Sequence, residues 1–407
     1  MKRMACSLLL AACLAAILFL PAAADEARAA VQADEYGVNI PFTPSTRTGR
    51  YVFALYEGAA ADPQALLARE ELTVQSARTV FLPAPISLAE PKTYTLTVTA
   101  LPMPGREGLD REATKSAALQ TARVCGHPDD TGAFLMGNGS AQNPYQVASP
   151  AQLAHLQKHT GSHYKQACDI DMAGVSWQNF DFNGTYDGDG YVIRNLTSTS
   201  SGKPAGLFAT FSGALMNLGI ENANIAMTGG SWHAGTLAGQ ARDATISRCY
   251  SKDCTVSTTA GYDAGGILGN DSTNIVIEDC YALGGVYSGV RHAAGISGDF
   301  NGDSTANTIR RCYAIPAKLS GTQGNGMIAG LWGKAKMENC YFPNDTACGS
   351  TTATASGNVA GASGLPLASF TNAASFSGWD IGGSGSAWVM GENGPELKVF
   401  AQRRAGG

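Results

Sequence analysis

The residues of this chain most able to do chemistry are cysteines and tyrosines that stand side by side in a repeated phrase. The phrase is five residues long, ends in Cys-Tyr, and occurs at 246–250, 277–281, 309–313 and 337–341. A thiol in a fixed sequence context could mark an active site, and aromatic rings in register could stack on sugar rings. The candidates are Cys249, Cys280, Cys312 and Cys340, followed by Tyr250, Tyr281, Tyr313 and Tyr341.

Two interpretations of the four cysteines stay open. Eight cysteines remain if Cys6 and Cys13 leave with the leader described below, and an even count in an exported chain permits disulfides. Stacking of the phrases in adjacent coils would bring the Cα atoms to a distance compatible with bridging, but parallel Cβ vectors suit a disulfide poorly. We therefore favour a column of small buried thiols over a disulfide ladder.

The four tyrosines also allow two interpretations. If the rings point outward, they form a flat aromatic ladder that could bind a glycan. If they point inward, they pack one coil against the next, which is the interpretation that we favour. The sequence does not set which residues of the strand face the core, so either the cysteine or the tyrosine column could be the buried one.

Acidic turns suggest calcium sites, although tight turns are the commoner meaning of such residues. Alternate oxygen ligands, as hard cations prefer, occur in two places, with Asp187 and Asp189 in the first and Asp299, Asn301 and Asp303 in the second. The second resembles the start of an EF-hand loop, but Ser304 stands where that loop requires Gly. We expect neither a metal nor a cofactor.

The chain has none of the short catalytic motifs of the common hydrolases. It contains no H-E-x-x-H pair of a metallopeptidase, no G-x-S-x-G elbow and no phosphate-binding loop. A polysaccharide lyase or glycoside hydrolase remains the alternative, because such enzymes use acids that converge on one face of a solenoid. The acids that could do so are Glu278, Asp279 and Asp299, joined by Asp303 or Glu338. Arginines occupy the matching positions of other coils, so we favour a solvated face of mixed charge and no enzyme activity.

The elements that must position these residues follow from the repeat. A second phrase with Gly and apolar residues keeps nearly the same spacing, at 205–209, 235–239, 265–269, 294–298 and 329–333. A unit of about 30 residues cannot bury its apolar side alone, so the copies must stack as a solenoid. Each unit has short apolar runs broken by Gly, Asn, Asp and Ser and no helical period. The repeat therefore predicts a parallel β-helix, within an all-β chain.

The ends of the chain define the predicted domains. Residues 1–24 have the charged start, apolar run and small-residue cleavage site of a secretory signal. Residues 31–124 predict a small antiparallel β-sandwich, and residues 125–397 predict the β-helix, with a capping helix near 150–158 and a C-terminal cap near 376–397. No later segment is apolar enough to span a membrane. With 28 Lys and Arg against 33 Asp and Glu and no basic stripe, a nucleic-acid partner is not expected.

From about residue 138 to residue 397 the chain resembles the GLUG-repeat proteins of bacterial surfaces, some of which accompany immunoglobulin-A peptidases. The resemblance rests on the Gly-Leu-like phrases and on the segments that precede them, at 143–147, 151–153, 169–172 and 182–193. It departs from the pattern at Ala209, Thr236 and Ser297. The resemblance implies a right-handed parallel β-helix that is secreted or held at a bacterial cell surface. It further implies an adhesin-like function, with a glycan or a host surface protein as partner.

Overall fold

The chain forms two compact units, residues 1–138 and 139–407. The structure is a computed structural model that describes residues 32–34, 37–44, 49–102, 113–120, 123–127, 129–230, 232–301 and 306–406. The predicted leader at 1–24 and the calcium candidate Asp303 lie outside the described residues.

The first unit contains two antiparallel sheets around one core. One sheet has the order β1-β2-β5, and the other has the order β4-β3-β6-β7, with a short 3₁₀ helix at Pro63–Ala65 before β4. Val38 of one sheet and Phe53 of the other belong to the same buried cluster. Alternating apolar residues on facing strands explain this arrangement. The strands are β1 (Gln32–Asp34), β2 (Gly37–Phe42), β3 (Arg50–Glu57), β4 (Leu66–Thr73), β5 (Arg78–Pro83), β6 (Thr93–Ala100) and β7 (Ala113–Gln120).

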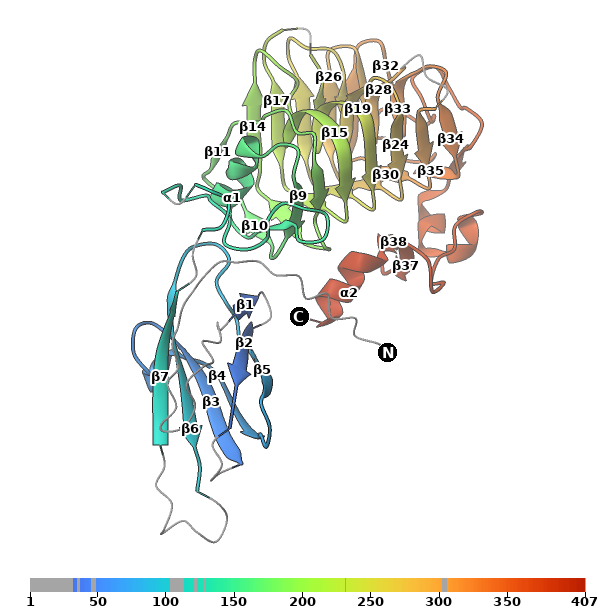
Figure 1. Cartoon of the computed structure of the whole chain (residues 1–407). Coiled ribbons are helices and arrows are strands. Elements are labelled where there is room, and N and C mark those ends of the chain that lie inside the picture. The colour runs from blue at the N-terminus through green and yellow to red at the C-terminus, as the bar shows by residue number, and fades with distance from the viewer. Residues whose placement is uncertain are drawn as a thin grey trace. The chain divides into compact units, whose positions relative to one another are not determined.

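The second unit is a parallel β-solenoid, as the repeat predicts (Figure 1). Each coil contributes one strand to each of several parallel sheets, so equivalent residues of successive coils are hydrogen-bonded neighbours. The sheet that carries the tyrosines has the order β10 (Ile170–Asp171), β13 (Val192–Arg194), β16 (Gly219–Glu221), β20 (Tyr250–Lys252), β25 (Tyr281–Leu283), β30 (Tyr313–Ile315), β35 (Cys340–Pro343) and β36 (Ala362–Leu365).

Three further parallel sheets complete the coils. The second sheet consists of β11 (Ser176–Trp177), β14 (Thr197–Ser200), β17 (Asn224–Met227), β21 (Thr255–Thr258), β26 (Val286–Gly289) and β31 (Lys318–Gly321). The third consists of β8 (Tyr145–Val147), β9 (His163–Gln166), β12 (Thr185–Asp187), β15 (Phe208–Met216), β19 (Ala238–Ser247), β23 (Leu268–Asp271), β24 (Ile275–Glu278), β28 (Ser297–Phe300), β29 (Thr308–Arg310), β33 (Ala329–Trp332) and β34 (Lys336–Glu338). The fourth consists of β18 (Ala234–Gly235), β22 (Ala264–Gly265), β27 (His292–Ala294) and β32 (Gly324–Gly326).

The Cys-Tyr phrase is a corner of the coil. The residue before each cysteine has left-handed backbone, with φ of +50° at Arg248 and Asp279, +47° at Arg311 and +50° at Asn339. Such a residue turns the chain sharply between two strands. Each cysteine then faces the solenoid interior with no exposed surface. Tyr250, Tyr281 and Tyr313 begin the next strand, and Tyr341 is the second residue of β35. Both columns are therefore buried, the cysteines in the core and the tyrosines in a separate cluster outside it.

The four cysteines are free thiols that share one hydrogen-bonding pattern. The thiol of Cys280 donates to the carbonyl of Glu278 at 3.1 Å, and those of Cys249 and Cys312 donate to the carbonyl two residues earlier at 3.3 Å. Burial raises the pKa of the Cys249 and Cys312 thiols well above its usual value, because a thiolate would be desolvated there.

We expect the folded protein to resist thiol-directed reagents at neutral pH, because the sulfur atoms of all four cysteines are buried where a reagent cannot reach them. Alkylation of the native protein should leave these four cysteines unmodified. Unfolding without a reductant should release all eight described cysteines as thiols. Mass spectrometry before and after denaturation measures both results, and a bridged peptide between two phrases would contradict the expectation.

Two segments outside the parallel sheets flank the coils. The first contains α1 (Pro150–His155), which Ser149 caps by accepting a hydrogen bond from the Gln152 amide at 3.2 Å, and a 3₁₀ turn at Leu156–Lys158. The second runs from 366 to 406 and is called here the strap. It contains the 3₁₀ segments Leu367–Thr371 and Ala373–Ser375, the hairpin of β37 (Trp388–Gly391) and β38 (Gly394–Leu397), and α2 (Lys398–Gly406).

The strap differs from the predicted C-terminal cap near 376–397. Figure 1 shows this red segment turning back from the last coil and running along the side of the solenoid. Its contacts confirm the direction, because Trp379 meets Tyr341, Trp388 meets Tyr281, and Phe400 meets Tyr250 of an earlier coil. The aromatic residues expected to close the end of the solenoid therefore cover its flank, where the tyrosine rings offer a matching apolar surface.

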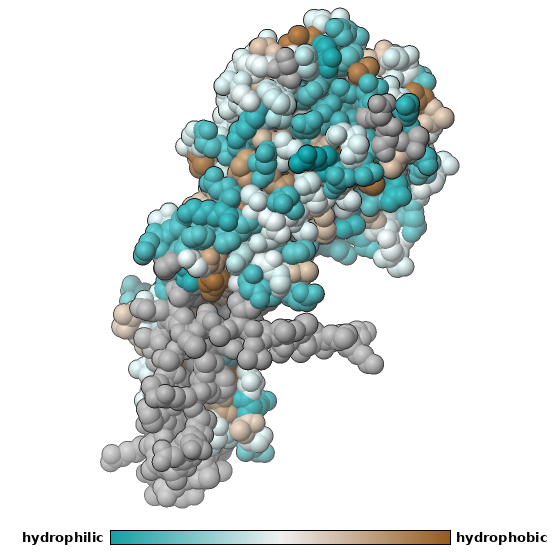
Figure 2. Space-filling model, turned by 45° about the horizontal axis from the view of Figure 1, so that its top comes forward, coloured by the Kyte–Doolittle hydropathy of each residue, from teal (hydrophilic) through white to brown (hydrophobic). Residues whose placement is uncertain are grey.

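Among the residues that Figure 2 colours by hydropathy, brown ones are scattered between teal and white ones on the face shown. Scattered single hydrophobic residues are normal for a protein surface. Among the described residues, no helix has both the length and the apolar character needed to cross a membrane.

Candidate functional site

The four tyrosines form a ladder in which identical residues lie one coil apart. The rings of Tyr250 and Tyr281 stack with centroids 4.9 Å apart, those of Tyr281 and Tyr313 lie 5.0 Å apart, and both pairs are inclined by 3°. Backbone pairing sets this geometry, because Tyr250, Tyr281, Tyr313 and Tyr341 are register partners in one parallel sheet.

The strap covers this ladder. Trp388 lies 6.1 Å from Tyr281 and 5.9 Å from Tyr313, and its indole N–H donates to Asp279 Oδ1 at 2.9 Å. Tyr313 and Tyr341 donate their hydroxyl protons to strap carbonyls at 2.9 and 2.7 Å. None of the four side chains is more than 9% exposed. The ladder therefore does not offer the open aromatic platform for sugars that an outward column suggested, because tryptophan and phenylalanine side chains already occupy it.

The ladder ends at Gly219, and a pocket opens there. Gly219 is the register partner of Tyr250 on the preceding coil, and Val192 precedes it in turn. A Cβ atom on Gly219 would lie 2.6 Å from Tyr250 Cζ, so the glycine gives the Tyr250 ring room. Without another large ring at this position, the side of the solenoid and α2 enclose a pocket of about 720 Å³. Of the four predicted tyrosines, Tyr250 lines this pocket.

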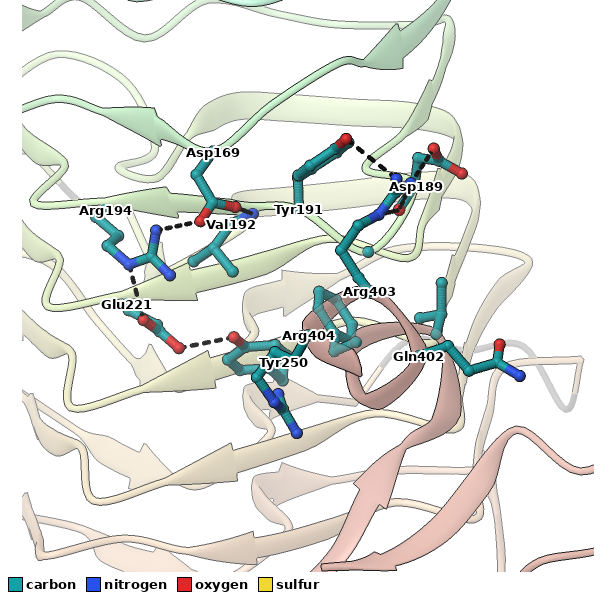
Figure 3. A pocket seen from close by; sticks show the side chains of 13 residues that line it. Asp169, Asp189, Tyr191, Val192, Arg194, Glu221, Tyr250, Gln402, Arg403 and Arg404 are labelled. Carbon is teal, nitrogen blue, oxygen red and sulfur yellow. Dashed lines mark hydrogen bonds and ion pairs between the residues drawn. The ribbon is translucent and has the colours of Figure 1, made fainter. Parts of the chain in front are cut away.

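One arginine joins two acidic side chains on the solenoid wall of the pocket (Figure 3). Arg194 Nη1 donates to Asp169 Oδ2 at 2.6 Å, and its Nε donates to Glu221 Oε2 at 3.1 Å. Tyr250 donates its hydroxyl proton to Glu221 Oε1 at 2.7 Å. Parallel register explains the set, since Arg194 and Glu221 are partners on adjacent coils. Within the described residues the hydrogen bonds of Arg194 come from Nε and Nη1, which leaves both N–H groups of Nη2 available to a ligand.

The surroundings of Arg194 and Tyr250 fix the protonation states of these two side chains. The hydrogen bond to Asp169 raises the pKa of the Arg194 guanidinium, so this side chain stays charged. Burial, followed by the neighbouring Tyr281 and Glu221, raises the pKa of Tyr250 well above its usual value. Tyr250 is therefore a neutral phenol that donates a proton to Glu221.

The opposite wall of the pocket comes from α2. The Arg403 guanidinium lies over the Tyr191 ring at 4.1 Å, donates to the Tyr191 hydroxyl at 3.0 Å, and pairs with the carboxylate of Asp189. Figure 3 shows Arg403 reaching from α2 to Asp189 and Tyr191, which lie in the turn between β12 and β13. Contacts between segments more than 200 residues apart thus hold the pocket in shape.

The calcium candidates have protein partners in the structure. Asp187 accepts hydrogen bonds from the Asp189 amide at 2.9 Å and from Asn217 at 2.8 Å, and Asp189 pairs with Lys165 at 3.3 Å as well as with Arg403. Asp299 accepts a hydrogen bond from the Asn301 amide at 3.0 Å. Asp187 and Asp189 therefore belong to a turn in which Asp187 accepts hydrogen bonds from the chain and Asp189 pairs with two of its cations.

The acids considered for polysaccharide cleavage are also paired. Glu278 pairs with Arg310 at 2.6 Å and with Arg311 at 3.2 Å. Asp279 accepts two hydrogen bonds from Arg311, one from Nε to Oδ1 at 2.7 Å and one from Nη2 to Oδ2 at 2.6 Å. Asp299 belongs to a different cluster, described below, and Glu338 is exposed on β34. Arg310 is the register partner of both Glu278 and Glu338, so an arginine separates these two acids.

Two known proteins are similar to part of this chain. The chain is a β-solenoid repeat protein. Over 280 residues, 62% of its length, it is 27% identical to halomucin from Haloquadratum walsbyi, and this match spans only 3% of halomucin. The solved structure of a proposed immunoglobulin A1 protease from Bacteroides ovatus is similar with a TM-score of 0.44 and 21% identity, covering 65% of this chain and 94% of that one. No family model matches the chain, so membership of the GLUG group stays a prediction.

The sequence contains a signal for the pocket that was missed. Residues 215–219 are a fifth copy of the Cys-Tyr phrase, in register with 246–250, but they end in Leu218-Gly219. Asn217 has the same left-handed corner, with φ of +53°. Glycine stands here in place of the tyrosine of the other copies, and the space that a ring would fill is part of the pocket. Aligning the copies by their corner residue would have shown Gly219, Arg194 and Glu221 together.

Proposed function

We propose that this chain is an exported, non-enzymatic surface protein whose solenoid binds a glycan in the pocket at the end of the tyrosine ladder. The leader expected at 1–24 supports export. The observation that carries the binding proposal is the pocket itself, where Arg194 joins Asp169 and Glu221 beside apolar ring surfaces.

The chemistry of the pocket suits a carbohydrate. Asp169 and Glu221 offer acceptors and Arg194 offers a donor, which together match the hydroxyl groups of a sugar. Val192, Phe400 and the Tyr250 ring provide apolar surface for the C–H face of a pyranose. The lining has three carboxylates and three arginines, so it does not select strongly for a charged ligand. A volume of about 720 Å³ lies within the roughly 300–1,000 Å³ of typical small-ligand sites.

Fixed geometry adds to the argument for binding. Asp169, Arg194, Glu221 and Tyr250 all stand at strand ends or on strands of one hydrogen-bonded sheet, and each holds the next by a hydrogen bond. A site that is already arranged before the ligand arrives loses little entropy on binding. This supports a passive binding role, with polysaccharide cleavage as the alternative.

The test is a glycan array followed by affinity measurements on the best ligand. Arg194→Ala and Glu221→Gln should each weaken binding at least tenfold, because a hydrogen bond to a charged group is worth about 1.5–3 kcal/mol and tenfold corresponds to about 1.4 kcal/mol. Arg310→Ala is the matched control, since Arg310 is similarly exposed and also pairs with a glutamate across coils, but lies outside the pocket.

Three outcomes would contradict the proposal. Equal weakening by Arg194→Ala and Arg310→Ala would place binding elsewhere on the solenoid. Shortening of the bound glycan during incubation, seen by mass spectrometry, would favour a lyase or hydrolase instead. Binding of a host protein that survives both pocket substitutions would also remove the glycan site from the proposal.

A further inference from the structure

A second cluster, on another sheet, stacks histidine and aspartate in consecutive coils. Backbone pairing of β18 with β22 and of β22 with β27 puts His233, Asp263 and His292 at the same position of three successive coils. His292 Nδ1 lies 2.8 Å from Asp263 Oδ1, and His233 Nδ1 lies 3.1 Å from Asp263 Oδ2. The Asp263 carboxylate is therefore held between two imidazoles, with its side chain completely buried.

Asp299, near the end of β28, adds a second carboxylate to this column. One ligand atom each from His233, Asp263 and Asp299 lie within 4.8 Å of one another, and all three residues are buried. Zinc bonds to nitrogen and oxygen are about 2.0–2.2 Å long, so two donors on one ion are at most about 4.4 Å apart. The three side chains thus stand within a small movement of the spacing that a bound ion requires.

The buried Nδ1 atom of His233 is a separate indication that an ion binds here. This atom makes no hydrogen bond within the described part of the chain, although Asp263 Oδ2 is close, because the two groups are not aligned for one. The residue is only 9% exposed, so water does not readily replace the missing partner. A buried polar atom without a partner costs about 1–3 kcal/mol. A cation between the imidazole and the carboxylates would remove this cost.

The burial of the cluster selects the kind of ligand. With no exposed surface on Asp263 and 11% on the side chains of His233 and Asp299, a sugar or a peptide cannot reach the donors, whereas an ion can. Calcium and magnesium prefer oxygen donors alone, while imidazole with carboxylate suits zinc and neighbouring transition metals. We propose that His233, Asp263 and Asp299 bind a divalent transition-metal ion, with Zn²⁺ as the probe.

The Arg291 guanidinium lies against the two carboxylates that would bind the ion. Its Nη2 lies 2.7 Å from Asp263 Oδ2 and 3.9 Å from Asp299 Oδ2, and its guanidinium rests over the Tyr262 ring at 4.0 Å. The side chain is 29% exposed and its Nε makes no hydrogen bond within the described residues, so the guanidinium can turn outward when an ion enters. Arg291 therefore competes with the metal for the same two carboxylates.

The test uses the purified, chelator-treated full chain, titrated with Zn²⁺ by calorimetry. The wild type should bind at this cluster, and His233→Gln and Asp299→Asn should each lose one equivalent or weaken it at least tenfold. Arg291→Met should bind Zn²⁺ more tightly, a gain that misfolding could not produce. His163→Gln, on β9 outside the cluster, is the control for other zinc-binding histidines.

Calcium serves as the comparison ion and should not compete with Zn²⁺ at this cluster. Identical zinc stoichiometry and affinity in the wild type, His233→Gln and Asp299→Asn would overturn the proposal. Unchanged or weaker affinity in Arg291→Met would overturn it as well, because the competing guanidinium would then have no effect on an ion.

Discussion

Replacing Trp388 with alanine is expected to lower the free energy of unfolding of the solenoid by about 4 kcal/mol. Trp388 is 1% exposed and packs against Trp379 at 4.4 Å and against the rings of Tyr281 and Tyr313. The substitution would remove a large buried aromatic side chain and leave a cavity between the strap and the ladder. It would also remove the indole hydrogen bond to Asp279.

Urea unfolding followed by near-ultraviolet circular dichroism measures this loss on the full chain. Trp232→Ala is the matched control, because Trp232 is 38% exposed and its loss should cost little. Trp388→Phe separates packing from hydrogen bonding, since it keeps most of the ring contact and should cost only about 1–2 kcal/mol. Similar losses for Trp388→Ala and Trp232→Ala would show that the strap does not hold the ladder.

Replacing Gly265 with alanine is expected to lower the free energy of unfolding by about 3 kcal/mol, because the backbone around this residue of β22 leaves no room for a side chain. A Cβ atom at Gly265 would lie 2.6 Å from the Gly298 amide nitrogen and would overlap the Leu268 carbonyl oxygen. Both are backbone atoms of strands that pair between successive coils, so neither can move aside by itself. The Gly-rich phrase is therefore a steric requirement of close coil packing.

Gly202→Ala is the control for this second prediction. A Cβ atom at Gly202 meets nothing within 4 Å, so alanine there should change the unfolding free energy by less than about 0.5 kcal/mol. Urea titrations of the two variants, run side by side, compare the same chemical change at a tight and an open position. Equal stability of the two variants would contradict the steric explanation.

The parallel solenoid was predictable because its information is local and repeated. The phrases at 246–250 and 277–281 stack by backbone pairing, which depends on spacing and on turn-forming residues rather than on any distant contact. The same spacing placed Tyr250 over Tyr281 and Cys249 beside Cys280. The left-handed corner at Arg248 explains why both columns could be buried, since the chain turns immediately before them.

The candidate site was predictable only in part. Tyr250 and Asp189 are candidates from the sequence that line the pocket, whereas Arg194, Glu221 and Asp169 belong to no pattern that pointed to a site. The His233, Asp263 and His292 column also escaped prediction, although it keeps the repeat spacing and stands two residues before three Gly-containing phrases. Reading every column of the aligned repeat, including those with unlike residues, would have found it.

The sequence by itself determined the coils, their order and which residues of neighbouring coils touch, because hydrogen-bonded strands transmit a 30-residue period directly into space. Only the tertiary structure decided what covers the outer face. The strap has no repeat, and its place depends on contacts such as Trp388 with Asp279, 109 residues away. Side-chain packing over that separation leaves no periodic trace in the sequence, so the covered ladder and the pocket beside it emerge only in the folded chain.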